Sequence, residues 1–146
     1  YTTLFRSECS GPLVVISADT AISMMAVNAK QELVGGVILP GPQLSLSALV
    51  KNTAQLPQID LAAKAPASIL GKSTSSCLQN GFILGTASLL DGLAERFCAE
   101  LGPQTAFYAT GNLPIPIREA CCTPILYRET LITDGLYRIW MKNKKG

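Results

Sequence analysis

The chain has 146 residues, of which 48% are hydrophobic and 15% charged, and it carries a formal net charge of +2 without any histidine. This composition indicates one folded domain with a sizeable core and argues against disorder. The lack of imidazole excludes Cys/His zinc sites and Ser-His or Cys-His catalytic pairs. No apolar run reaches the roughly 20 residues of a membrane span. The basic cluster at the end, Lys142, Lys144 and Lys145, is expected to be solvated, so we expect neither a membrane nor a nucleic acid as partner.

The cysteines are too few and too irregularly spaced for a disulfide framework. They are Cys9, Cys77, Cys98, Cys121 and Cys122, an odd number with no C-x-x-C pair. We therefore expect reduced, buried thiols in a cytoplasmic protein. The chain begins with Tyr and shows no signal peptide, which suggests a piece of a longer protein.

An irregular segment and three strands are predicted for the first forty residues. Residues 1–11 are mixed and polar and are expected to form an irregular lead-in. Three apolar, β-branched runs follow, and their order predicts an antiparallel meander: Pro12–Ala18, Thr20–Lys30 and Glu32–Leu39.

After Pro40-Gly41-Pro42 the pattern changes to that of a helix. From Gln43 the apolar spacing predicts about three helical turns, which Ser45 or Ser47 could start. Residues Pro57–Leu70 lack a clear period and predict a long surface loop, a kind of segment that is often functional.

A long helix is predicted from Ser73 to the Gly102-Pro103 stop. Its apolar residues recur at nearly 3.6 spacing: Leu78, Phe82, Leu89, Leu93, Phe97 and Leu101. Gly81, Gly85 and Gly92 interrupt this stripe, each at a cost of about 1 kcal/mol relative to alanine. We expect either that another backbone packs close to the helix or that the helix breaks in two.

The last third predicts one more strand and two helices. Thr105–Gly111 is a buried strand, a short helix starts near Pro114 or Pro116, and a final helix covers residues 131–143, with Thr133 or Asp134 as N-cap. Its apolar side would consist of Leu131, Leu136, Ile139 and Trp140. The whole order predicts an α/β layered domain.

The tetrapeptide Gly71-Lys72-Ser73-Thr74 looks like the end of a Walker A loop. That loop needs an earlier glycine at position 66, directly after a strand. The residue there is Pro66, which has no amide hydrogen and a fixed φ, so it cannot open a phosphate nest. We interpret the stretch as a helix N-terminus capped by Ser73 or Thr74, whose positive end suits an anionic or hydroxyl-rich ligand.

Five segments, in this order and at this spacing, resemble the C-terminal half of type III pantothenate kinases. They are SADTAIS (17–23), LVGGVILPGPQLSLSALVKNTAQLP (33–57), GKST with QNGFILGTASLLDGLAERFCAELG (71–102), ATGN (109–112) and LITDGLYRIWMKN (131–143). The resemblance implies that residues 12–146 form one RNase H-like lobe of the actin-like ATPase fold, without the N-terminal lobe. In that lobe a three-stranded meander and a further strand form a mixed sheet flanked by helices. The implied activity is the ATP-dependent phosphorylation of pantothenate to 4'-phosphopantothenate, the first step of coenzyme A biosynthesis, in the cytoplasm.

The resemblance also implies roles for individual residues. Thr20 matches the family threonine that contacts the ATP phosphates, and Gly111 with Asn112 matches the turn near the adenosine. Thr74 matches the threonine that binds pantothenate. The implied cofactors are ATP with Mg²⁺ and a monovalent cation, K⁺ or NH₄⁺. The family is dimeric, and we expect a homodimer through the glycine-bearing helix.

Three departures from the family pattern bear on activity. Ser17 replaces the aspartate that binds the monovalent cation, and a neutral hydroxyl is the weaker cation ligand. Asp19 replaces a glycine in the phosphate-facing turn, where like-charge repulsion at 4 Å would cost about 1 to 4 kcal/mol. Met25 replaces a second aspartate.

The first phosphate loop and the base aspartate of the family belong to the N-terminal half, so this chain is expected to be inactive alone. Two functions stay open. One is the C-terminal lobe of the kinase, and the other is a non-catalytic relative that acts as a regulatory or accessory binding protein.

Five other side chains have plainer interpretations. Asp91 and Glu95 lie one turn apart and could form a metal or acid/base site, but we favour a structural or interface role, because Asp91 stands beside Gly92 in a family-like Asp-Gly step. Lys72 is expected to be a solvated loop lysine. Tyr137 and Trp140 are expected to be core or dimer contacts.

Overall fold

A computed structural model describes residues 11–53 and 55–144 of the chain, so the predicted lead-in lies almost wholly outside the described residues. The elements in chain order are β1 (Leu13–Ala18), β2 (Ala21–Val27), β3 (Leu33–Pro40), α2 (Pro42–Lys51), α3 (Thr74–Leu101), β4 (Ala106–Gly111), α4 (Ile115–Ala120), β5 (Ile125–Tyr127) and α5 (Leu131–Asn143).

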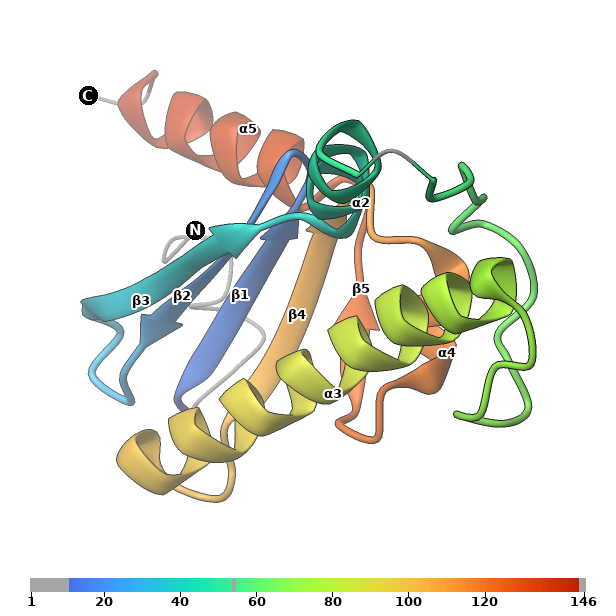
Figure 1. Cartoon of the computed structure of the whole chain (residues 1–146). Helices are drawn as coiled ribbons and strands as arrows, with labels where there is room; N and C mark the ends of the chain where they lie inside the picture. The colour runs from blue at the N-terminus through green and yellow to red at the C-terminus, as the bar shows by residue number, and fades with distance from the viewer. Residues whose placement is uncertain (1–10, 54, 145–146) are drawn as a thin grey trace.

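The strands form one five-stranded mixed sheet in the order β3-β2-β1-β4-β5. The predicted meander is confirmed, because β1 pairs antiparallel with β2 and β2 antiparallel with β3. On the other side β4 runs parallel to β1, and β5 runs parallel to β4. Figure 1 shows α3 crossing one face of the sheet and α5 lying behind the other. The α/β class is therefore confirmed, and the arrangement is consistent with one lobe of an actin-like fold.

Strand β1 is the centre of the molecule and is buried on both faces. Val14, Ile16 and Ala18 belong to the larger core cluster, which the strands share with α3. Leu13 and Val15 point the opposite way, into a small cluster with Val27, Tyr108 and Leu131. This alternation explains why the sequence of β1 is apolar at nearly every position.

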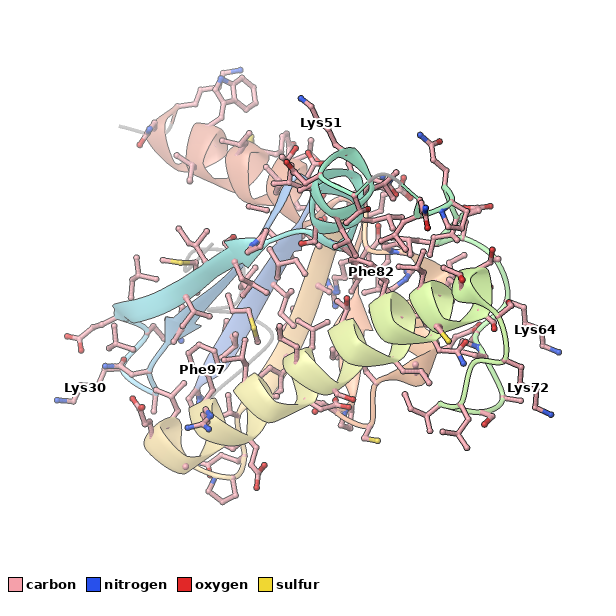
Figure 2. All side chains as sticks on the ribbon, viewed as in Figure 1. Lys30, Lys51, Lys64, Lys72, Phe82 and Phe97 are labelled. Atoms are coloured by element: carbon pink, nitrogen blue, oxygen red, sulfur yellow. The ribbon has the colours of Figure 1, made fainter. Side chains whose placement is uncertain are left out.

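Helix α3 runs unbroken over 28 residues, so the expected break at the glycines does not occur. Beyond its chain neighbours and the adjoining backbone of α3, a side-chain carbon added at Gly81, Gly85 or Gly92 would meet no atom within 4 Å, so no other backbone of the described chain approaches these glycines either. The fully buried apolar residues of α3 are Ile83, Ala87, Leu90 and Ala94. They form a line on the helix surface beside the predicted stripe. Phe82 and Phe97 of that stripe are half-buried against the core, on the side of α3 that faces the sheet (Figure 2).

Three local predictions were wrong. Helix α2 begins at Pro42 with Gly41 as N-cap, and not at a serine, since proline is well suited to a first helical position. The N-cap of α5 is Thr130, whose hydroxyl bonds to the Asp134 carboxylate rather than to a backbone amide. Strand β5 was missed because three residues are too few to show an alternating pattern.

Residues 57–70 carry neither helix nor strand, as predicted. Leu61 anchors the loop in the core, where it is 2% exposed. The buried Asn80 of α3 donates hydrogen bonds from its side-chain amide to the carbonyls of Ser68 and Ile69, at 2.8 and 3.2 Å. The loop is therefore tied to the domain at two points.

Helix α5 is apolar but mostly uncovered. Leu131 is buried, whereas Leu136, Tyr137 and Trp140 are 61%, 61% and 53% exposed. Tyr137 and Trp140 contact each other, with ring centroids 6.0 Å apart, and are not core residues. Within residues 11–53 and 55–144, every helix falls short of the length or apolarity that a bilayer crossing requires.

The four thiols of the described residues are free, as expected, but none of them is fully buried. Cys77 and Cys122 are exposed, and Cys98 and Cys121 are half-buried. Cys9 lies outside the described residues.

Candidate functional site

The tight β1–β2 turn, Asp19 and Thr20, is the centre of the candidate site. The turn lies at the carboxyl end of β1, beside the carboxyl end of the parallel neighbour β4. In Figure 1 both strands point to the end of the sheet where α2 begins. Ligands of open α/β sheets bind at such carboxyl ends, so this edge is the first place to look for a site.

Gly41 brings α2 against this turn. Its amide donates to the Thr20 carbonyl at 2.9 Å. A side-chain carbon at position 41 would overlap the carbonyl oxygens of Asp19 and Thr20. Only glycine permits this approach, and it places the first turn of α2 beside the hairpin.

Gly111 makes the matching approach from β4. Its φ is +88°, a value that favours glycine, and a side-chain carbon there would overlap the Ala18 carbonyl oxygen. The next amide, that of Asn112, donates to the same carbonyl. The chain therefore turns sharply out of the sheet and presents Asn112 beside the β1–β2 turn.

These three backbone segments enclose a hollow of about 290 Å³. Thr20 and Asn112, two residues assigned from the sequence, line it together. The remaining lining residues are Asp19, Pro42, Gln43, Leu44, Ser47 and Pro114.

The hollow has a positively polarised end and one negative side chain. The first amides of a helix have no partner within the helix and carry the positive end of its dipole. Helix α2 supplies such an end without any acidic residue in its first turn. Asp19 is exposed at the rim and is the one carboxylate of the lining. The arrangement suits an anion whose charge lies toward α2.

Thr74 lies apart from this hollow, at the first position of α3. Ser73 is the N-cap, as predicted, and its hydroxyl accepts from the Ser76 amide at 3.2 Å. The Ser76 hydroxyl in turn accepts from the amides of Lys72 and Ser73, each at 2.9 Å. Gly71-Lys72-Ser73-Thr74 therefore forms a helix cap, and both Lys72 and Thr74 are exposed.

Asp91 takes the structural role predicted for it. Its carboxylate accepts the amides of Cys122 and Thr123, both at 2.8 Å, and so ties α3 to the segment between α4 and β5. Burial raises the pKa of the Asp91 carboxyl, but these hydrogen bonds outweigh that effect and hold the pKa below its ordinary value of 3.8. Burial and the nearby Asp91 and Cys122 raise the pKa of the Cys121 thiol to about 12.

The amino-acid sequence matches the family described as type III pantothenate kinase over residues 2–96. The chain belongs to this family.

Full-length relatives of this pantothenate kinase family support the assignment. The chain is 38% identical to a type III pantothenate kinase of Koribacter versatilis over 137 residues, which is 93% of the chain and 49% of that relative. It is 37% identical to the enzyme of Frankia alni over 133 residues, or 91% of the chain and 52% of the relative. The chain thus spans about half the length of the curated relatives it matches.

The family fold is also found among solved structures. A Campylobacter jejuni protein described as a conserved Baf family transcriptional activator superimposes with a TM-score of 0.65, at 19% identity, over 99% of this chain and 63% of that one. At this identity the likeness concerns the fold alone.

A pantothenate kinase implies both a nucleotide and a monovalent cation. The residues of the hollow suit the nucleotide phosphates, whereas those around Ser17 do not suit the cation. A helix N-terminus and the Thr20 hydroxyl are suitable donors for nucleotide phosphates. Ser17, which stands where the resemblance implies a cation-binding aspartate, is in register with Ser23 and Thr110, which are neutral side chains. The described part of the chain also holds no group of three or more Cys, Asp or Glu side chains that could bind a metal. The residues present do not fit the cation.

Reasoning from the sequence missed Gly41, Gln43, Leu44, Ser47 and Pro114. The Pro-Gly-Pro break at residues 40–42 was the available signal, because a glycine between two prolines at a strand-to-helix junction marks a constrained approach. Met25, the third departure from the family pattern, lies on β2 opposite Gly36 and away from the hollow.

Proposed function

We propose that residues 12–146 form the C-terminal lobe of an ATP-dependent kinase that converts pantothenate to 4'-phosphopantothenate in the cytoplasm. Membership of the family supports the reaction. The observation that carries the proposal is that Thr20, Asn112 and the first turn of α2 line one hollow.

In this proposal each side of the hollow has one task. Thr20 and the α2 amides bind the ATP phosphates, with Mg²⁺ bound to those phosphates, and Gly111 with Asn112 lies against the adenosine. Phosphoryl transfer depends mainly on positioning and on stabilisation of charge. The first phosphate loop and the base aspartate would come from the half of the relatives that this chain does not span, so the chain alone is inactive.

An ADP-release assay tests the reaction. The chain would be assayed alone, and joined to the N-terminal half of the Koribacter versatilis relative, with and without pantothenate and with and without K⁺. We expect no turnover from the chain alone and pantothenate-dependent turnover from the joined protein. Turnover should depend little on K⁺, because Ser17 replaces the cation carboxylate. Absence of pantothenate-dependent ADP release from the joined protein would refute the proposal.

Two threonine variants should separate the two substrates. Thr20→Ala removes a donor to charged phosphates and is expected to weaken ATP binding by about 1.5 to 3 kcal/mol. Thr74→Ala removes one hydrogen bond to pantothenate and is expected to weaken its binding by about 0.5 to 1.5 kcal/mol. Isothermal titration of each ligand, on the joined protein, measures both values. Thr133→Ala, an exposed threonine on α5, is the control and should change neither affinity.

A second candidate function is that of a regulatory or accessory binding protein without catalysis. Asp19 in the lining of the hollow favours it, because a carboxylate there repels phosphate, and so does Ser17. The same assay decides between them, since the accessory protein would bind ligands in the titrations and release no ADP.

We further propose that a second copy of the chain packs on the glycine face of α3. Gly81 and Gly85 line an open hollow of about 250 Å³ with Phe82 and Leu89. Apart from the chain neighbours of each glycine and the adjoining backbone of α3, no atom of the described chain lies within 4 Å of a side-chain carbon placed there. Glycines in a helix are costly unless a backbone approaches them, and a partner copy would supply that approach.

Light scattering tests this association. The wild-type chain is expected at twice its mass of 15.5 kDa, and Gly85→Lys, which fills the face with a charged chain, is expected to be a monomer. Ala48→Lys places the same side chain on an exposed position of α2 and should remain a dimer. A wild-type monomer at high concentration would contradict the proposed interface.

A further inference from the structure

We propose that Tyr127 is a positioning residue for nucleotide binding, because its hydroxyl fixes the Gly111–Asn112 turn from the side of β4 opposite to β1. The inference rests on the proposed function, and it adds a residue that no sequence motif indicated. Tyr127 is the last residue of β5, the three-residue strand at the edge of the sheet.

The Tyr127 hydroxyl donates a hydrogen bond to the carbonyl of Gly111. The side chains of the turn contribute little to holding it, since Gly111 has no side chain and Asn112 is exposed. On its inner side the Asn112 amide bonds to Ala18. The turn is therefore held between β1 on one side and the Tyr127 hydroxyl on the other.

Two neighbouring contacts keep the segment after β5 close to β4. The Arg128 amide donates to the Ala109 carbonyl at 2.8 Å, and the Thr110 hydroxyl donates to the Glu129 carbonyl at 3.3 Å. Because these contacts do not involve the Tyr127 hydroxyl, they would keep β5 in place without it. Removal of the hydroxyl should therefore release the turn and leave the sheet intact.

Arg118 of α4 fixes the ring that carries the hydroxyl. Its guanidinium carbon lies 4.0 Å from the centre of the Tyr127 ring, a stacking distance for a cation on an aromatic face. The Arg118 Nε is buried and has no hydrogen-bond partner among the described residues. The stacking holds the ring face against the guanidinium, so the pair orients the phenol toward Gly111.

Removing the Tyr127 hydroxyl should weaken the binding of the adenosine part of the nucleotide and leave the binding of its phosphates unchanged. Asn112 is the residue assigned to the adenosine, whereas Thr20 and the α2 amides, assigned to the phosphates, are held by Gly41. A released Gly111–Asn112 turn spends less time in the binding geometry and lowers the affinity for ligands that contain adenosine. The affinity for a bare polyphosphate should not change.

Tyr127→Phe tests this, because phenylalanine keeps the ring that stacks on Arg118. Titrations of the full chain with ATP and with inorganic tripolyphosphate should show ATP binding weakened about five-fold, the effect of one hydrogen bond, and tripolyphosphate binding unchanged. Tyr137→Phe, an exposed tyrosine on α5, makes the same chemical change and should alter neither affinity. Amide hydrogen exchange at Asn112 should speed up in Tyr127→Phe alone.

The outcomes are distinct. Unchanged ATP affinity in Tyr127→Phe would overturn the inference and leave the proposed function standing. An equal loss for ATP and tripolyphosphate would also overturn it, because it would mean a general structural role. A wild-type chain that binds neither ligand would refute the proposed nucleotide site, and the inference would fall with it.

Discussion

Replacement of Gly111 by alanine is expected to cost about 3 kcal/mol or more of folding stability and to destroy the hollow. The backbone at this position has a φ of +88°, which alanine tolerates poorly. The added methyl group would also overlap the Ala18 carbonyl oxygen. The overlap can be relieved only if β4 and β1 move apart, and this would break the Asn112–Ala18 hydrogen bond that shapes the turn.

Gly81 of α3 provides the matched control, because the same substitution there should raise the free energy of unfolding instead of lowering it. At Gly81 the same methyl group meets open space, and alanine is the better helix former. Gly81→Ala should therefore stabilise the monomeric chain by about 1 kcal/mol. Urea denaturation followed by circular dichroism, at a concentration where the chain is monomeric, measures both variants. A Gly111→Ala chain with wild-type stability would mean that the turn is not constrained as described.

Loss of the Asp91 carboxylate is expected to have the second largest effect. Asp91→Ala leaves the amides of Cys122 and Thr123 without their acceptor, and we expect it to lower the free energy of unfolding by about 2 to 3 kcal/mol. Asp91→Asn should also destabilise, because its NH₂ group would face an amide donor. Glu95→Ala, an exposed carboxylate one turn away, should lie within about 0.5 kcal/mol of the wild type.

The same contact predicts how stability depends on pH. The pKa of Asp91 is lower in the folded chain than its ordinary value of 3.8, so the unfolded chain binds the proton more readily. The contribution of the carboxylate is fully present above that value, and it is lost as the pH falls through the lower, folded pKa. Unfolding experiments between pH 2 and pH 6 should therefore show a steeper loss of stability toward low pH in the wild type than in Asp91→Ala. Parallel curves would contradict the assigned role.

The sheet could be predicted where burial left a pattern along the sequence. Strand β1 and strand β4 are apolar at nearly every position because they lie between two layers, and the meander follows from its short turns. Strand β5 left no such pattern, because its three residues include the exposed Leu126. It forms because β4 offers it a parallel partner, which is a tertiary effect.

The site was predictable only in part. Thr20 and Asn112 were found through a family resemblance, and the structure brings them to one hollow. Gly41 was visible in the sequence as a chain break, but its role depends on a close approach to residues far away in the sequence. Tyr127 has no local signal, because its hydroxyl acts through a carbonyl on another strand.

The hollow is shaped mainly by main chain, and this has an evolutionary consequence. Its outline follows from a hairpin and from two glycines that allow backbones to touch. A side chain of its lining, such as that of Asp19, can be substituted without altering that outline. A descendant can thus lose phosphoryl chemistry by single substitutions while its cavity survives, ready to be used for sensing the same metabolites.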